Sequence, residues 1–315
     1  MKRAAVLLLL VLAVRPAVTA EPLLLPALGG AQPRLDRLLL LDAATAGRRI
    51  IAVGERGRIL LSDDDGHSWR FGASPTETTL VSVFFVDDTH GWAVGHDAVI
   101  LRSEDGGASW QQVYVAPDEN APLLDVWFRD AEHGWAVGAY GMALQTVDGG
   151  RSWERIQVDA GDRHLNALAG SPDGKIYIVG ESGTILRSDD NGRVWTKLVS
   201  PYGGSYFGVL VLPGGNPLIF GMRGKVFRGG AHGESWQAIA GGADASLQGG
   251  RVTTRGEVLL VGNDGVILVS RDGGKTFSER RARDRKVIAA VLPLGESELL
   301  LFGESGLTRF AGAGI

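Results

Sequence analysis

Acidic residues recur at regular positions along the chain, and their chemistry has to be judged first. Five aspartates occupy the same place in a short repeated motif: Asp64, Asp105, Asp148, Asp190 and Asp272. Three glutamates follow a glycine in Gly-Glu-x-Gly segments: Glu55, Glu181 and Glu304. Paired carboxylates can hydrolyse a glycosidic bond when they flank it. Repetition at a constant offset indicates a structural role instead, because a catalytic acid is needed only once.

Other residue patterns for chemistry are missing from the sequence. A calcium loop is ruled out, because no glutamate follows the repeated aspartate at the EF-hand spacing. Zinc would need three or four converging ligands, whereas His90 and His133 recur at one turn position. The sequence contains no phosphate loop, nucleotide fingerprint or Ser/His/Asp pattern. We therefore expect no metal, no cofactor and no enzymatic activity.

A cluster of cations stands out near the C-terminus. It consists of Arg280, Arg281, Arg283, Arg285 and Lys286, interrupted by Asp284. Such a cluster can dock an acidic partner segment or anionic lipid headgroups, or it can be a solvated loop. Arg56 and Arg223 are expected in turns of the same face and would extend it. We interpret these seven residues as a partner-binding site.

The first twenty residues resemble an export signal. Lys2 and Arg3 precede an apolar run of eleven residues, Ala4–Val14, which is too short to span a bilayer. Small residues at Val18–Ala20 suit a cleavage site. We predict a signal peptide over 1–20, with an uncleaved membrane anchor as the alternative. Residues 21–315 are then one periplasmic domain without membrane insertion.

The predicted mature chain is acidic and lacks cysteine. Removing Lys2, Arg3 and Arg15 from the 32 basic residues leaves 29 against 36 acidic ones, a formal net charge of −7. This charge argues against nucleic-acid binding, which requires a basic footprint. Without cysteine there is no disulfide and no lipidated N-terminal Cys.

Seven glycines recur after short apolar runs, 41 to 43 residues apart. They are Gly54, Gly95, Gly138, Gly180, Gly221, Gly262 and Gly303. Fifteen residues after each of the first six stands an aromatic residue: Trp69, Trp110, Trp153, Trp195, Trp236 and Phe277. Six matches at one offset identify an internal repeat, and a repeat of this length indicates one supersecondary unit per period.

Each repeat predicts four short strands. In the second repeat they cover 80–86, 92–94, 99–103 and 110–113, separated by turns rich in Asp and Gly. Short strands at regular spacing are typical of a barrel, a sandwich or a propeller. A period of about 41 residues with four strands selects the propeller. The sequence therefore predicts an all-β fold, a seven-bladed β-propeller with four-stranded blades.

The seventh repeat predicts only three strands, over 287–292, 298–302 and 307–310. The mature N-terminus offers an apolar segment, Leu23–Leu25, ahead of the first inner strand, which we expect at Leu38–Leu41. Pro22 and Pro26 flank this segment, and proline suits an edge strand. We predict that an N-terminal strand completes the last blade and closes the seam to the first.

The turn between the third and fourth strands contains an eight-residue motif, which runs from Ser62 to Trp69 in the first repeat. Its Asp can accept N–H bonds inside the turn, its Gly supplies a positive φ, and its aromatic can bury a large area between blades. The fifth copy is degraded at Gly229 and Ala231. We assign structural roles to Asp64, Asp105, Asp148, Asp190 and Asp272, and to Trp69, Trp110, Trp153, Trp195 and Trp236.

This motif is the Asp box, or bacterial neuraminidase (BNR) repeat, which in sialidases lies away from the active site. A fuller repeat, His-Gly-Trp-Ala-Val-Gly followed by an apolar strand and the Asp box, is clearest at His90–Gly95 and His133–Gly138. Over residues 36–312 the chain resembles the photosystem II stability/assembly factor family of cyanobacteria and chloroplasts, which has relatives in non-photosynthetic bacteria. The resemblance implies a seven-bladed propeller of the lumen or periplasm. For photosynthetic members it implies binding of a newly made reaction-centre protein, and an arginine-rich patch on the propeller.

In a propeller, the turns between second and third strands share one face with the connections between blades, and the Asp boxes lie on the other. Residues just after the repeated glycines vary between repeats, which suits a binding surface on a constant scaffold. We expect a non-enzymatic, monomeric scaffold that binds a membrane protein or membrane-protein complex through this loop face. The alternatives are a glycan-active propeller, either a sialidase-like hydrolase or a lectin, and a structural subunit of an envelope transport system. A sialidase would need a Phe/Tyr-Arg-Ile-Pro segment and an arginine cluster, and the sequence lacks both.

Overall fold

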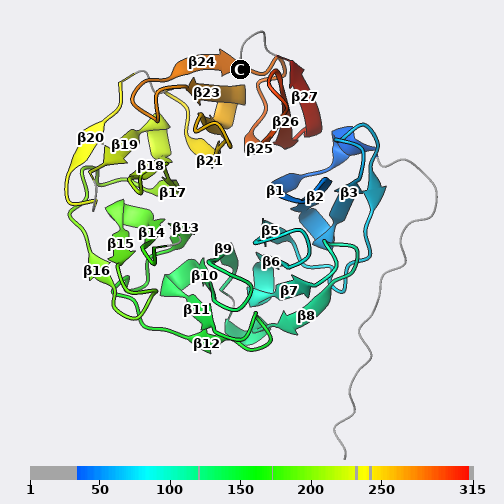
Figure 1. The fold of residues 1–315 in the computed structure, drawn as a ribbon, viewed down its shortest axis with the longest axis horizontal. Helices are drawn as coiled ribbons and strands as arrows, with labels where there is room; N and C mark the ends of the chain where they lie inside the picture. Colours follow the sequence, from blue (N-terminus) through cyan, green and yellow to red (C-terminus); the bar gives the residue numbers. More distant parts are fainter. Residues whose placement is uncertain (1–33, 120, 172, 231–232, 241–242, 312–315) are drawn as a thin grey trace, which may run out of the picture.

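The computed structural model is a ring of seven antiparallel sheets around a central axis (Figure 1). It describes residues 34–119, 121–171, 173–230, 233–240 and 243–311. Within each sheet the strands follow one another in sequence order, from the axis to the rim. The predicted seven-bladed propeller is thereby confirmed. The predicted signal peptide over 1–20 lies outside the described residues.

Six of the seven sheets have four strands, and the seventh has three in the described part of the chain. The strands, blade by blade, are β1 (Leu40–Ala46), β2 (Arg49–Gly54), β3 (Ile59–Ser62) and β4 (Arg70–Phe71); β5 (Leu80–Phe85), β6 (Gly91–Gly95), β7 (Ile100–Ser103) and β8 (Gln111–Tyr114); β9 (Leu123–Phe128), β10 (Gly134–Gly138), β11 (Ala143–Thr146) and β12 (Glu154–Arg155); β13 (Leu165–Gly170), β14 (Ile176–Gly180), β15 (Ile185–Ser188) and β16 (Thr196–Lys197); β17 (Tyr206–Val211), β18 (Pro217–Gly221), β19 (Val226–Gly229) and β20 (Trp236–Ala238); β21 (Leu247–Val252), β22 (Val258–Gly262), β23 (Val266–Ser270) and β24 (Ser278–Arg281); β25 (Ile288–Leu294), β26 (Glu298–Gly303) and β27 (Gly306–Ala311).

Short 3-10 turns connect some of these strands. One follows the second strand in each of the first six blades: η2 (Glu55–Gly57), η3 (His96–Ala98), η5 (Ala139–Gly141), η6 (Glu181–Gly183), η7 (Met222–Gly224) and η8 (Asn263–Gly265). Two more are η1 (Leu35–Arg37), which precedes the first blade, and η4 (Pro117–Glu119), which lies between the second and third blades. The described residues contain no helix long and apolar enough to cross a membrane.

Most strand bounds agree with the sequence to within a residue or two, with two informative exceptions. The first inner strand begins at Leu40 and continues to Ala46, beyond the expected Leu38–Leu41. The outer strand of blade two begins after Trp110, at Gln111, because the Trp110 side chain turns inward. Its indole Nε1 donates to the Gly107 carbonyl at 3.1 Å, so this residue belongs to the turn.

The core consists of seven apolar clusters, one between each pair of neighbouring blades. Second strands are buried on both sheet faces, and β6, with the sequence Gly-Trp-Ala-Val-Gly, is buried at all five positions. This explains why these strands are nearly continuous apolar runs, where a strand with one solvated face would alternate. Each blade is therefore stable only between two neighbours.

A side chain from the second strand of one blade packs against the Asp-box glycine of the next. In blade two this side chain is Trp92, which lies so close to Gly150 that an added Cβ would be 2.4 Å from its Nε1. The equivalent pairs around the ring are Ile51–Gly107, Trp135–Gly192, Tyr177–Gly233, Leu218–Gly274 and, across the seam, Leu300–Gly66. These six glycines have φ between +65° and +78°, a conformation that side chains disfavour. Each glycine therefore has two reasons to lack a side chain.

The Asp boxes form hydrogen-bonded hairpin turns. Asp64 accepts the Ser68 N–H at 2.8 Å and the Ser68 hydroxyl at 2.6 Å, and also the Ser62 hydroxyl at 2.9 Å. Boxes two, three and six repeat these bonds, and box four keeps the N–H bond to Val194. The hydrogen bonds from Ser68 hold the pKa of Asp64 well below its usual range. Trp69 contributes to the apolar cluster between blades seven and one.

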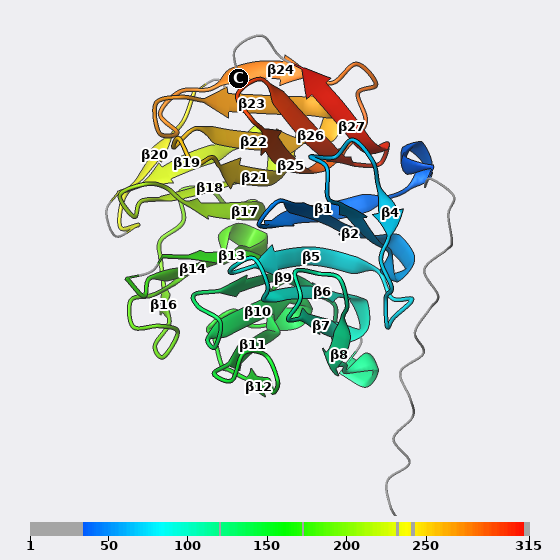
Figure 2. The same ribbon diagram turned by 45° about the vertical axis from the view of Figure 1, so that its right-hand side comes forward.

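Blades one and seven share a packed seam (Figure 2). Leu40 and Leu60 of blade one cluster with Leu300 and Phe302 of blade seven. The Arg309 guanidinium of β27 donates to the Asp65 carbonyl at 2.6 Å, which links the last sheet to the first Asp box. The segment predicted to complete the seventh blade, Leu23–Leu25, lies outside the described residues.

Every inner strand has a β-bulge at the same place, one residue after its first, which curves the strand around the axis. The inner strands enclose a central cavity of about 610 Å³. Three charged residues line it in the described structure: Asp42, Asp125 and Arg251. The cavity wall is otherwise apolar or neutral.

One serine joins two of these charged residues across three blades. The Ser82 hydroxyl lies 2.9 Å from Asp125 Oδ1 and 3.2 Å from Asp42 Oδ2. The hydroxyl has one proton to share between the two carboxyl groups, so the contact is most favourable when one of them is protonated. Loss of hydration, opposed by the Leu168 N–H bond but reinforced by repulsion from Asp42, raises the pKa of Asp125 to about 7. Burial also raises the pKa of Asp42.

Deleting residues 21–28 should lower the melting temperature by roughly 5 °C or more. The reason is that β27 would lose the strand we predict on its outer edge. Thermal unfolding followed by circular dichroism measures this, with a Gly/Ser segment of equal length as a control for tail length. An unchanged melting temperature would show that residues 21–28 do not complete the seventh blade.

Replacing Gly150 by Ala should destabilise the fold more than replacing Gly273. Their φ values, +78° and +72°, impose similar left-handed strain of about 1–2 kcal/mol. Only Gly150 has a close neighbour, because nothing lies within 4 Å of an added Cβ at Gly273. We expect Gly150→Ala to lower the free energy of unfolding by a further ~1–3 kcal/mol in urea denaturation. Equal costs would show that the contact between blades is unimportant.

The Asp42–Ser82–Asp125 contact should make the fold less stable as pH rises. The pKa of Asp125 is about 7 in the folded chain and about 4 when unfolded. Its stabilising contribution is therefore complete below about pH 4 and lost as pH rises through about 7. Between pH 5 and 8 we expect wild type to lose on the order of 2 kcal/mol of unfolding free energy relative to Asp125→Asn. Parallel pH profiles for the two proteins would contradict this assignment.

Candidate functional site

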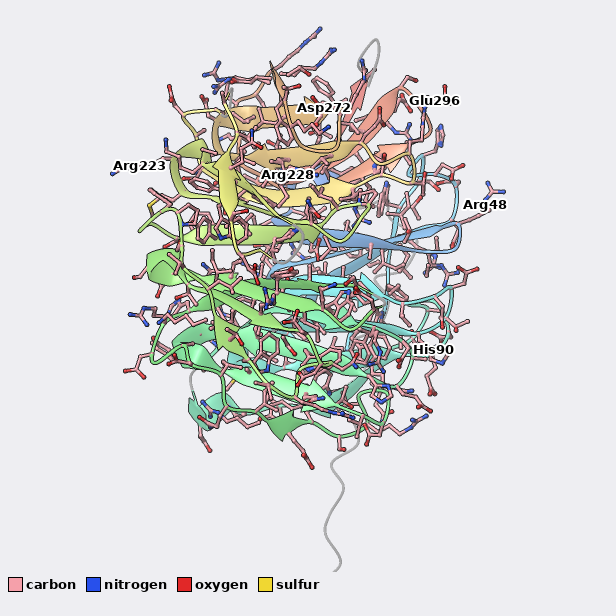
Figure 3. The ribbon with its side chains drawn as sticks, turned by 60° about the vertical axis from the view of Figure 1, so that its left-hand side comes forward. Arg48, His90, Arg223, Arg228, Asp272 and Glu296 are labelled. Carbon is pink, nitrogen blue, oxygen red and sulfur yellow. The ribbon has the colours of Figure 1, made fainter. Side chains whose placement is uncertain are left out.

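The propeller has two chemically different faces. On one, each 3-10 turn contacts the connection that leaves its blade: the Gly141 N–H donates to Arg163 O at 2.9 Å and the Gly265 N–H to Lys286 O at 3.0 Å. We call these turns and connections the loop face. On the other, the Asp boxes contact the first-to-second-strand turns, and we call it the Asp-box face. Figure 3 shows Arg223 at one edge of the molecule and Arg48, His90 and Glu296 at the opposite edge.

The loop face presents four kinds of residue from six similar backbone turns. The middle residue of each turn is left-handed, with φ between +52° and +59°: Arg56, Asp97, Tyr140, Ser182, Arg223 and Asp264. Residues with a Cβ occupy this region at a cost and usually for a reason. Sequence analysis singled out these positions for their variability but missed their conformation. The recurrent Gly-x-x-Gly spacing is the signal that could have revealed it.

The predicted cations lie on or beside the loop face. Arg56 and Arg223 are exposed in η2 and η7. Arg283, Arg285 and Lys286 are exposed in the connection between blades six and seven. Arg280 and Arg281 are half-buried at the end of β24. Most of these cations come from blade five and from the connection between blades six and seven. Arg56 comes from blade one, which follows blade seven around the ring.

Two of these arginines share one carboxylate. Arg285 forks onto Asp264, with Nε 2.6 Å from Oδ1 and Nη2 2.6 Å from Oδ2. Arg281 Nη1 also contacts Asp264 Oδ2, and Arg281 Nε lies 2.6 Å from Glu279 Oε1. Hydrogen bonding from Arg285 holds the pKa of Asp264 below its usual value. Spacing in the sequence could not show this pairing, because it depends on how the side chains turn.

Four other cations of the patch are uncommitted. The side chains of Arg223, Arg283 and Lys286, and that of Arg56, make no ion pair with a described residue. Asp284, the one acid within the cationic run, accepts the Ser305 hydroxyl at 2.6 Å and the Lys286 N–H at 3.3 Å. In this patch, Asp264 holds Arg281 and Arg285 in place. The side chains of Arg56, Arg223, Arg283 and Lys286 are available to an anionic partner.

The loop face also exposes apolar surface away from the cations. Tyr140 is 55% exposed, and its ring stands edge-on to His164 with centroids 5.0 Å apart. Val199, in the connection between blades four and five, is 88% exposed. An exposed aromatic with a polar tip is a common anchor at protein interfaces.

The glutamates of the Gly-Glu-x-Gly segments each have a partner within the fold. Glu55 pairs with Arg58 at 2.6 Å. Glu181 accepts the His164 N–H at 3.1 Å, and Glu304 lies 3.5 Å from the Val287 N–H. Glu55 therefore supports its own turn, whereas Glu181 and Glu304 each support the connection beside the turn, and both arrangements suit a repeated turn residue.

No group of three or more potential metal ligands occurs among the residues that the structure describes. His90 lies beside Asp87 and His133 beside Asp130, at 2.8 Å and 2.9 Å, in equivalent turns of blades two and three. Both contacts brace first-to-second-strand turns on the Asp-box face.

Comparisons with known proteins agree with this architecture. Among curated relatives, the photosystem II assembly protein Ycf48 of Thermosynechococcus vestitus is 36% identical over 47 residues, which is 15% of this chain and 14% of that protein. The photosystem II assembly lipoprotein Ycf48 of Trichormus variabilis is 36% identical over 53 residues, 16% of each chain. The matched segments thus span about one seventh of these relatives.

A solved structure extends the likeness to nearly the whole fold. The structure described as YCF48 bound to D1 peptide superposes with a TM-score of 0.70 at 21% identity, covering 94% of this chain and all of that one. The family model for the photosynthesis system II assembly factor YCF48 matches residues 61–160 and 112–258, which together are more than half of the chain. The chain therefore belongs to the photosynthesis system II assembly factor YCF48 family.

Proposed function

We propose that this chain is an exported, non-enzymatic propeller that binds a membrane protein, or a membrane-protein complex, to aid its assembly or stability. The partner surface is the loop face, and the cations Arg56, Arg223, Arg283 and Lys286 make the first contacts. The complementary partner is an acidic segment of a protein chain. We propose that the propeller acts as a monomer and binds no nucleic acid.

One observation supports this proposal above the others. Six turns of one backbone conformation display four kinds of side chain on the loop face: two arginines, two aspartates, one tyrosine and one serine. The Asp-box face, in contrast, repeats the same hydrogen bonds from blade to blade. A constant frame with a variable face is the arrangement of a recognition scaffold.

The family supports the class of partner. One solved relative is described as bound to D1 peptide, and curated relatives are named photosystem II assembly proteins. By analogy we propose that this chain recognises an extended segment of a membrane protein. A propeller whose repeated acids brace hairpins needs no catalytic group for that task.

The site of action we propose is the periplasm. The segment 1–20 would direct export and be removed. Two curated relatives are named lipoproteins, whereas this sequence contains no cysteine for lipid attachment. The cations of the loop face would then supply the attraction to the partner.

Reversing three free cations should abolish partner capture. We expect the triple variant Arg223→Glu, Arg283→Glu and Lys286→Glu to bind its partner about tenfold more weakly or worse, because attraction becomes repulsion. The partner is first identified by cross-linking in whole cells and mass spectrometry. Its affinity for the purified chain is then measured by surface plasmon resonance.

A matched control places the same charge change on the Asp-box face. Arg48, Arg193 and Lys275 are exposed there, and their reversal to Glu alters net charge equally. This control should keep at least about half of the wild-type affinity. Binding that survives the loop-face reversal, or fails equally in the control, would reject the loop face as the partner surface.

A further inference from the structure

Asp264 occupies the position that a partner's carboxylate would take. It lies at the left-handed position of η8, and its two oxygens face the guanidinium groups of Arg281 and Arg285. Arg–carboxylate forks are the preferred geometry for recognising an acidic group. One carboxylate serves two arginines here, and Glu279 also pairs with Arg281 Nε at 2.6 Å. Among the described residues, Arg285 is therefore the arginine that pairs with Asp264 alone.

All three side chains remain accessible. The side chains of Arg285, Asp264 and Arg281 are 57%, 42% and 27% exposed. Exposed ion pairs contribute modest free energy because water also solvates each partner, and a forked pair such as Arg285–Asp264 lies at the upper end of that range. An incoming carboxylate can therefore replace Asp264 on either arginine at small cost, and the released Asp264 returns to water.

The cations that neighbour Asp264 can attract an acidic segment toward it. Arg283 and Lys286 lie in the same connection, and Arg223 occupies the equivalent turn position of the preceding blade. These three make no ion pair with a described residue. They can attract an acidic segment before any exchange at Asp264 takes place.

We propose that Asp264 is a built-in competitor that occupies the Arg285 fork and the Nη1 group of Arg281 until an acidic partner segment displaces it. Asp264 then sets the affinity threshold of the loop face, and weakly acidic segments fail to displace it. This inference rests on the proposed function, because it assumes that the loop face binds acidic protein segments. The contrary possibility is that Asp264 positions the two arginines for binding, in which case its loss weakens the site.

The substitution Asp264→Asn separates the two roles. Asn keeps the shape of the side chain and tolerates the left-handed conformation at φ 59°, but it loses the charge. The matched control is Asp97→Asn, at the same turn position in blade two, where the carboxylate accepts the Thr78 hydroxyl at 3.2 Å. Both variants change net charge equally, so long-range electrostatics is held constant.

The experiment measures binding of a fluorescein-labelled peptide of eight glutamates to the chain from residue 21 onward, by fluorescence anisotropy at low salt. We expect Asp264→Asn to bind about two- to fivefold more tightly than wild type, and Asp97→Asn to bind as wild type does. Arg285→Lys, which keeps the charge but cannot form the fork, should weaken binding.

The outcomes distinguish this inference from the function on which it rests. If wild type binds the acidic peptide but Asp264→Asn binds equally or more weakly, Asp264 is no competitor and the loop-face function stands. If no variant binds the acidic peptide, both the acidic-partner function and the competitor are overturned. If Asp264→Asn does not fold, an unchanged affinity in Arg285→Lys would still refute the fork as the binding element.

Discussion

The contact between a second-strand side chain and the Asp-box glycine of the next blade is the constraint on which this structure depends. Trp92 on Gly150 and Leu300 on Gly66 are two of its six instances, and the second of them spans the seam. Each blade buries its second strand on both faces, so no blade is stable without its neighbours. The contact sets how closely two blades approach, and repeating it closes the ring. Because this contact lies on the Asp-box face, the residues of that face can vary little between blades.

The residues of the loop face, in contrast, can vary between blades. Its six turns keep one backbone conformation through flanking glycines and hydrogen bonds to the neighbouring connections. The side chain at the left-handed position differs in type between blades: it is arginine twice, aspartate twice, tyrosine once and serine once. Cations gather on this face near blades five to seven, and Tyr140 is exposed elsewhere on it. Membership of this family and the difference between the two faces both support the function that we propose, recognition of another protein.

Much of this architecture is predictable from sequence because it repeats. Gly54 and Trp69, with their copies, mark blade number and strand order, and the Asp-box residues predict a hairpin turn. Contacts between blades were missed, since Trp92 and Gly150 meet only when the ring forms. The Asp42–Ser82–Asp125 contact was missed for the same reason, because the three residues come from three inner strands. Seven cations were identified as a patch, but the commitment of Arg281 and Arg285 to Asp264 depends on side-chain directions that spacing does not encode.

The central claim is that one face of the ring is the frame and the other receives the partner. Hydrogen–deuterium exchange of the chain, alone and saturated with the partner captured from cells, tests it most directly. Our account predicts slower exchange on binding in η7 and in the connection between β24 and β25, with unchanged exchange in the Asp boxes. Protection confined to the Asp boxes, with the loop face unaffected, would contradict it.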